Sequence, residues 1–162
     1  MTTCTVLHWI PLFIRHNSVE IIIDCLKFLQ KKDNLKLYAY VVLENHLHMV
    51  VQSNDIEKTM KSFKQYTAKE LLNLLKKENV TNILEQLKFY KKAHHKATNF
   101  QVWKEGYQLK QISSDEMMKT KIKYIHKNPI KRGYVDEAVH WRYSSARDYE
   151  GVQGLVDIER CF

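Results

Sequence analysis

The spacing of apolar and polar residues predicts three strands in this chain, two of them joined as a hairpin. Apolar residues alternate with polar or aromatic ones over 35–40 and again over 46–51, as strands with one buried face require. Glu44-Asn45 lies between these two runs and suits a tight turn, because asparagine tolerates turn conformations. A first strand is predicted over about 3–13, where most residues are apolar.

Apolar residues recur at helical spacing in four other segments. The clearest segment covers 56–77, with apolar side chains on one face and lysines on the other. Ser113-Ser114-Asp115-Glu116 has the S-x-x-E form of a capping box, and Pro129 is expected to end the helix that starts there at about Asn128. Two further helices are predicted. One begins at Asn17 or Ser18. The other covers 79–97, where His94-His95 is interpreted as part of a solvated basic surface.

The order of these elements is typical of the α+β class. Strand, helix, hairpin, helices, an extended segment over 100–112 and a final helix predict one antiparallel sheet with helices packed mainly against one face. A chain of 162 residues is long enough for a domain with a real core. No segment has the composition of a linker, so 1–162 is predicted to form a single domain.

The charge of the chain favours an anionic partner. Lysine and arginine number 26 against 18 aspartate and glutamate, which gives a net charge of +8. Such an excess suits nucleic acid or an anionic membrane surface, although a basic protein that is merely soluble would have the same composition. Charge alone therefore narrows the choice of partner without deciding it.

Cysteine spacing and the short apolar runs indicate a cytoplasmic protein. Cys4, Cys25 and Cys161 form no C-x-x-C pair, so a disulfide framework or a cysteine-based zinc site is not expected. The apolar stretch from Thr5 to Ile14 is interrupted by polar residues and is too short to cross a bilayer. We therefore expect no membrane partner.

The pair His46 and His48 is the first candidate for chemistry. Residues two apart on a strand point to the same face, so the two imidazoles are predicted to lie side by side, while Leu47, Met49 and Val51 turn into a core. Two adjacent neutral imidazoles are an ordinary start to a divalent metal site.

The second candidate lies on the last predicted helix. Tyr124 and Asn128 are four residues apart and therefore share a helix face. Taken singly, a tyrosine there is usually a packing residue and an asparagine at a helix end is usually a cap. If this helix crosses the sheet face that bears the histidines, Asn128 would be the third ligand of Mg²⁺ or Mn²⁺, and Tyr124 would be the nucleophile.

Basic residues surround this tyrosine. A phenol has a reference pKa of about 10 and needs help near neutral pH, which Lys121, one turn earlier, would give by stabilising the phenolate. The other candidate DNA-binding residues would contact flanking phosphates or add to the basic cluster, and they are Lys123, Lys127, Lys131 and Arg132.

Four blocks in this order resemble the single-tyrosine HUH transposases, and among them the branch of REP-associated tyrosine transposases. His-hydrophobe-His on a strand is followed some seventy residues later by Tyr-Ile-His-x-Asn-Pro, and the likeness covers about 5–149. A lone H-x-H would be weak evidence, whereas four ordered blocks are specific. The blocks are 40–51, 103–107, 124–135 and 141–149.

The resemblance implies a ferredoxin-like or RRM-like sheet, a divalent metal, and cleavage of single-stranded or hairpin DNA. Tyr124 takes the place of the nucleophile, which would give a 5′-phosphotyrosine and a free 3′-OH. His46 and His48 take the metal positions, and Asn128 stands where relatives put an amide near the metal. Monomer and homodimer both remain open.

Two departures from the family pattern bear on the site and the substrate. Glu44 stands where this group commonly has proline, and it would be a ligand, a base or, as we favour, a solvated turn residue. The chain also lacks the Gly-Thr-rich N-terminal motif that some members use on their hairpin. Two other hypotheses are a DNA- or RNA-binding module that no longer cuts and an unrelated protein with a structural metal or core site.

Overall fold

The computed structural model describes residues 1–92, 98–106 and 109–162. Its three strands are β1 (Thr2–Thr5), β2 (Lys36–Val42) and β3 (His46–Gln52). Its α-helices are α1 (His16–Asp33), α2 (Ile56–Lys77), α3 (Thr81–Phe89), α4 (Asp115–Lys131) and α5 (Ala146–Tyr149). Short 3-10 turns cover Leu7–Trp9, Leu12–Ile14 and Ala138–His140. The pair His94-His95 lies outside the described residues.

The sheet is antiparallel, with the strand order β1-β3-β2. A further piece of chain runs beside the end of β1. There the Leu7 N–H donates to the Val102 carbonyl at 2.8 Å, and the Lys104 N–H donates to the Thr5 carbonyl at 2.8 Å. Helix α1 connects β1 to β2, and α2 and α3 follow β3. With the extra piece of chain beside β1, this order gives the ferredoxin-like arrangement. The predicted α+β class is therefore confirmed.

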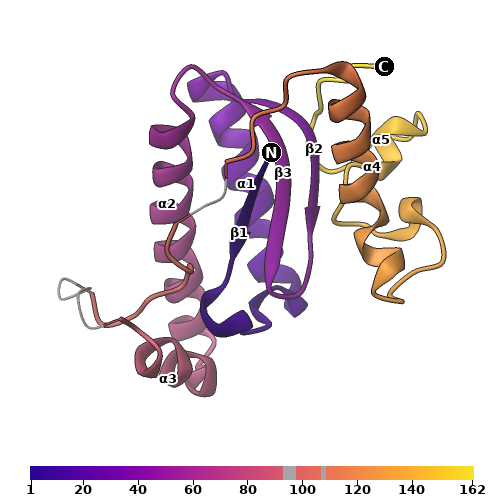
Figure 1. The fold of residues 1–162 in the computed structure, drawn as a ribbon. Coiled ribbons are helices and arrows are strands. Elements are labelled where there is room, and N and C mark those ends of the chain that lie inside the picture. The colour runs from indigo at the N-terminus through magenta and orange to yellow at the C-terminus, as the bar shows by residue number, and fades with distance from the viewer. Residues whose placement is uncertain (93–97, 107–108) are drawn as a thin grey trace.

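The larger core fills the space between the sheet and the pair α1 and α2, which lie on one side of it (Figure 1). Leu47 and Met49 of β3 are fully buried there, as their alternation with the histidines predicts. Phe63 and Leu71 of α2 pack against them from the helix side. This face holds most of the apolar surface that the chain buries.

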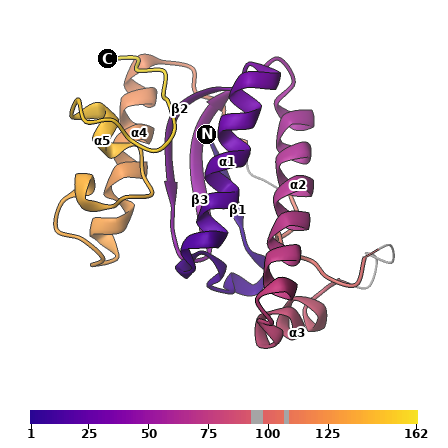
Figure 2. The same cartoon turned by 180° about the vertical axis from the view of Figure 1, so that it is seen from behind.

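The opposite face of the sheet is covered by α4, which lies on the far side of the strands from α1 and α2 (Figure 2). Ile122 and Ile125 of α4 pack on Val41 and Val50 in a smaller apolar cluster. The same face carries His46 and His48. The helix therefore covers only part of this face and brings Tyr124 beside His48.

The block 141–149 closes the outer edge of β2. The Val42 N–H donates to the Tyr143 carbonyl at 2.8 Å and the Ser145 N–H donates to the Tyr40 carbonyl at 3.0 Å. The Ser145 hydroxyl also pairs with Nε2 of His126 at 2.9 Å. The histidine of the Tyr-Ile-His-x-Asn-Pro block thus ties α4 to this edge.

The first strand is much shorter than predicted. It ends at Thr5, and two 3-10 turns replace the rest of the segment expected to be extended as far as Phe13. His8 and Trp9 have left-handed backbone angles, with φ of 50° and 57°, which no strand can contain. Pro11, which lacks an N–H, adds a second interruption.

Helix α4 differs from its prediction at both ends. Its N-cap is Ser114, whose hydroxyl accepts the Met117 N–H at 3.2 Å, so the cap lies one residue later than the S-x-x-E motif indicates. The helix also continues through Pro129 to Lys131. Proline is tolerated there because the last turn closes with other bonds, from the Arg132 N–H to the Asn128 carbonyl and from Gly133 to Ile130.

Candidate active site

His46 and His48 lie side by side on β3, as the strand period predicts. Their ring centroids are 4.9 Å apart with an interplanar angle of 83°. Cross-strand pairing places Thr5 opposite His46 and Thr3 opposite His48. Both imidazoles are largely buried, and His48 also lines a surface cavity.

Hydrogen bonds fix one nitrogen of each ring. Nδ1 of His48 pairs with the Thr3 hydroxyl at 2.7 Å, and Nδ1 of His46 pairs with Oδ1 of Asn45 at 2.6 Å. Burial, with Arg132 nearby, lowers the pKa of both imidazoles to about 4. Both rings are therefore neutral at pH 7 and have Nε2 available, which is the form that binds a metal ion.

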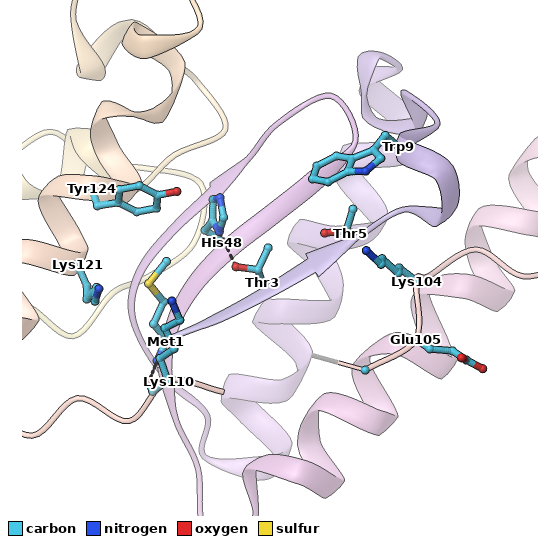
Figure 3. A pocket seen from close by; sticks show the side chains of 11 residues that line it. Met1, Thr3, Thr5, Trp9, His48, Lys104, Glu105, Lys110, Lys121 and Tyr124 are labelled. Carbon is cyan, nitrogen blue, oxygen red and sulfur yellow. Dashed lines mark hydrogen bonds between the residues drawn. The ribbon is translucent and has the colours of Figure 1, made fainter. Parts of the chain in front are cut away.

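Tyr124 of α4 lies beside this pair. Its ring centroid is 5.6 Å from that of His48, and the two rings meet edge to face at 69°. Figure 3 shows the hydroxyl pointing across the cavity toward His48. The side chain is 40% exposed, so a substrate can reach its oxygen from solvent.

Asn128 lies one turn beyond Tyr124 with its side chain largely buried. Its Nδ2 donates to the Tyr124 carbonyl at 2.8 Å, which fixes the amide and leaves Oδ1 as its one potential metal-binding atom. Among the described residues, no group of three His, Cys, Asp or Glu side chains is placed to hold a metal ion. A metal at the histidine pair would thus need an amide or substrate oxygen to complete its ligands, a set that suits Mg²⁺ or Mn²⁺.

Glu44 is not the solvated turn residue that the sequence favoured. Its side chain is 19% exposed and forms an ion pair with Arg132 at the end of α4. The second carboxylate oxygen is buried without a hydrogen-bond partner. The reason is tertiary, because Arg132 at the C-terminus of α4 pairs with Glu44 at the hairpin turn and shields most of its side chain from water.

The predicted basic residues fall into different surroundings. Lys131 holds its amine 5.3 Å from the centroid of the Tyr124 ring, and Lys121 lines the cavity next to Tyr124. Lys123 and Lys127 are exposed on α4 and do not line the cavity. Sequence reasoning assigned phenolate stabilisation to Lys121, whereas in the structure Lys131, two turns after the tyrosine, is the lysine over its ring.

Several residues of the site were missed from the sequence. Thr3 orients His48 across the sheet, and only the strand register reveals this contact. Trp9 meets His46 edge to face, with ring centroids 5.5 Å apart. Lys104 and Lys110 line the cavity from the segment beside β1. The general basic charge was the sequence signal for these lysines, but it did not say where they lie.

Comparison with known proteins finds similarity to a solved structure. The structure of a REP-associated tyrosine transposase bound to a REP hairpin aligns with 99% of this chain and 85% of its own, at a TM-score of 0.65 and 13% identity. No family model and no curated protein matches the sequence. At this identity the likeness shows a shared fold. Within the described part of the chain, none of the helices is both long and apolar enough to cross a membrane.

Proposed function

We propose that this protein is a metal-dependent nuclease and strand transferase that cuts single-stranded DNA, with Tyr124 as nucleophile. The observation that carries the proposal is the edge-to-face contact of Tyr124 with His48, at 5.6 Å between ring centroids. It unites the tyrosine with the histidine pair from elements more than seventy residues apart. The shared fold with a hairpin-bound transposase supports the same reading.

The reaction would be an in-line attack of the phenolate oxygen of Tyr124 on a backbone phosphorus. The new oxygen–phosphorus bond forms as the bond to the 3′ oxygen breaks, and that oxygen leaves with a proton taken from water. The product is a 5′-phosphotyrosine and a free 3′-OH. Because the bond energy is conserved, a second DNA end can later displace the tyrosine.

The residues around Tyr124 support each part of this step. A metal ion held by His46, His48 and Asn128 would polarise the scissile phosphate. The amine of Lys131 lies 5.3 Å from the tyrosine ring centroid and would place a positive charge next to the ring that carries the attacking oxygen. Glu44 holds Arg132 at the end of α4 and so keeps a guanidinium near the imidazoles.

The test is the formation of a covalent adduct. The protein is incubated with end-labelled hairpin DNA that carries single-stranded flanks, in Mn²⁺ or Mg²⁺, and resolved on denaturing gels. The adduct is expected with the native chain and is expected to vanish with Tyr124→Phe or with a chelator. Tyr134→Phe is the matched control, since Tyr134 is similarly exposed, at 42%, and lies beyond the end of α4.

A second candidate is a module on the same fold that binds DNA or RNA without cutting it. The observation that favours it is the lack, among the residues the structure describes, of a third His, Cys, Asp or Glu beside the histidine pair. Such a module would shift hairpin DNA on native gels and never yield an adduct. An unchanged shift after Tyr124→Phe, with no adduct in any metal, would favour this function over the first.

A further inference from the structure

A cavity of about 670 Å³ extends from the candidate site across the face of β1 (Figure 3). Tyr124 and His48 line it from α4 and β3, and Thr3 and Thr5 line it from β1. Trp9 lines it from the turn that follows β1. The cavity therefore continues away from the tyrosine over several residues of strand, which is the shape needed by an extended ligand.

The charged residues of this cavity are mainly cationic. Lys104, Lys110 and Lys121 line it, whereas among the described lining residues the one carboxylate belongs to Glu105. That carboxylate lies 2.5 Å from the amine of Lys92, so its charge is offset. The cavity thus suits a ligand that carries several negative charges along its length.

Trp9 lies on a strained piece of backbone that neighbouring contacts hold in place. Both His8 and Trp9 are in the left-handed region, with φ of 50° and 57°, which costs free energy for residues other than glycine. The Trp9 carbonyl accepts the Asn45 side-chain amide at 3.2 Å, and His8 stacks on Tyr90 with ring centroids 3.8 Å apart. These contacts hold an indole that is still 53% exposed.

Phe28 is an exposed aromatic residue that lacks this setting. Phe28 is 55% exposed on the regular helix α1, where it is a single apolar residue on the surface and needs no special explanation. Trp9 combines comparable exposure with strained backbone, a contact to His46 and a place in the lysine-lined cavity. A base can stack on an indole presented in this way.

We infer that Trp9, Lys104, Lys110 and Lys121 form a track for the single-stranded DNA next to the scissile phosphate. Trp9 stacks on one base, and the three lysines neutralise backbone phosphates along β1. The inference rests on the proposed function for the identity of the ligand. It adds Trp9, Lys104 and Lys110 as binding residues and gives the strand a path.

Tryptophan fluorescence tests the stacking contact in a Tyr124→Phe background, where no cleavage occurs. Trp103 is buried and Trp141 is only partly exposed, so quenching by a short single-stranded oligonucleotide should come mainly from Trp9. We expect saturable quenching that is lost with Trp9→Phe and kept with Trp141→Phe. Quenching that survives Trp9→Phe would overturn the stacking role.

Affinity gives a second readout that does not depend on fluorescence of the protein. With a dye-labelled oligonucleotide and anisotropy, Trp9→Ala should bind about 5- to 150-fold more weakly, the range for loss of one base–aromatic stack. Phe28→Ala is the matched control and should bind as the parent does. Equal affinity of the two variants would contradict the inference, provided that their circular dichroism spectra agree.

Salt dependence tests the lysines. Each phosphate contact on a single strand contributes about 0.7 to the slope of log K against log salt. Lys104→Ala, Lys110→Ala and Lys121→Ala should each lower that slope by about this amount, whereas Lys69→Ala, an exposed residue on α2, should not. Slopes unchanged by all three cavity variants would place the strand elsewhere.

These measurements separate failure of the track from failure of the chemistry. Binding that depends on Trp9 and the lysines, without any adduct from the native chain, would retain the track and reject the nuclease. An adduct from the native chain, together with native affinity and salt slope in the cavity variants, would reject only the track.

Discussion

The two faces of β3 carry different kinds of residues and are covered to different extents. On one face Leu47 and Met49 lie in the large core under α1 and α2. On the other face His46 and His48 lie next to a small apolar cluster under α4, beside an open cavity. One strand thus anchors the fold with one set of side chains and presents chemistry with the other.

The comparison shows why the site can be both ordered and accessible. The core face fixes the strand, and the register with β1 then brings Thr3 onto His48. Helix α4 docks on the other face through Ile122 and Ile125, while Tyr124 stays exposed at the cavity. Rigid elements therefore hold the candidate residues while substrate can still enter.

Adjacent substitutions on β3 give the largest expected contrast in stability. Leu47→Ala should lower the free energy of unfolding by about 2–5 kcal/mol, because it opens a cavity in the main core. His48→Ala should cost less than half as much, since its face borders open space, and it should abolish adduct formation. Urea denaturation followed by circular dichroism measures both variants. Equal destabilisation would show that the two faces contribute alike to the fold.

The hydroxyl that orients His48 should matter for metal affinity. Thr3→Val keeps the shape of the side chain but removes the bond to Nδ1 of His48, so Mn²⁺ should bind about 10- to 100-fold more weakly. Titration calorimetry measures the affinity without DNA. Thr5→Val is the control, because Thr5 pairs across the sheet with His46 but makes no hydrogen bond to it. A loss shared by both variants would count against a specific orienting role.

Lys131 and Lys127 test the surroundings of Tyr124 from the same helix. Lys131→Met should slow adduct formation by about 2- to 30-fold, because the positive charge over the Tyr124 ring is lost. Lys127→Met, at an exposed position one turn earlier on α4, should have the smaller effect. A larger loss with Lys127→Met would contradict the assignment.

The loss of stability in acid compares the histidines of the candidate site, His46 and His48, with His126, which packs against the edge of the sheet. Burial lowers the pKa of His126 to about 4, as it does for His46 and His48. Because unfolded histidine titrates near 6.5, the unfolded chain binds more protons below that pH. The contribution of these histidines to the free energy of unfolding is therefore fully present above about pH 6.5, and it is lost progressively as the pH falls toward 4.

His126→Gln distinguishes the two kinds of histidine. Denaturation curves at about pH 7 and pH 4.5 should show a smaller loss of stability for this variant, because one proton-binding difference is gone. Mn²⁺ should still raise the midpoint of the variant at pH 7, but should not do so for His48→Ala. Loss of the metal effect in His126→Gln would move this residue from packing to the metal site.

Local patterns were sufficient for much of the fold. The alternation along β3 predicted that the histidines and the pair Leu47 and Met49 lie on opposite faces of the strand. The apolar residues at helical spacing over 56–77 predicted the bounds of α2. The first strand failed because composition does not reveal left-handed backbone at His8 and Trp9, which tertiary contacts stabilise. Pro129 misled for a similar reason, since only the bonds after it show that the last turn survives.

The candidate site was only partly visible in the sequence. The strand period and the four-residue helical spacing identify the histidine pair and the Tyr124–Asn128 pair separately, and neither pattern shows that Tyr124 contacts His48, which depends on how α4 docks on the sheet. The partners Thr3, Glu44 with Arg132, and Trp9 depend on register and on packing between distant segments. No local pattern encodes these contacts.

The most direct test of the account is to locate the covalent bond. The adduct formed by the native chain with single-stranded hairpin DNA in Mn²⁺ is digested with protease and nuclease, and the nucleotide-bearing peptide is sequenced by mass spectrometry. We predict a single phosphotyrosine link at Tyr124, absent when a chelator is present. A link at another residue, or an adduct that forms equally without metal, would contradict the central claim.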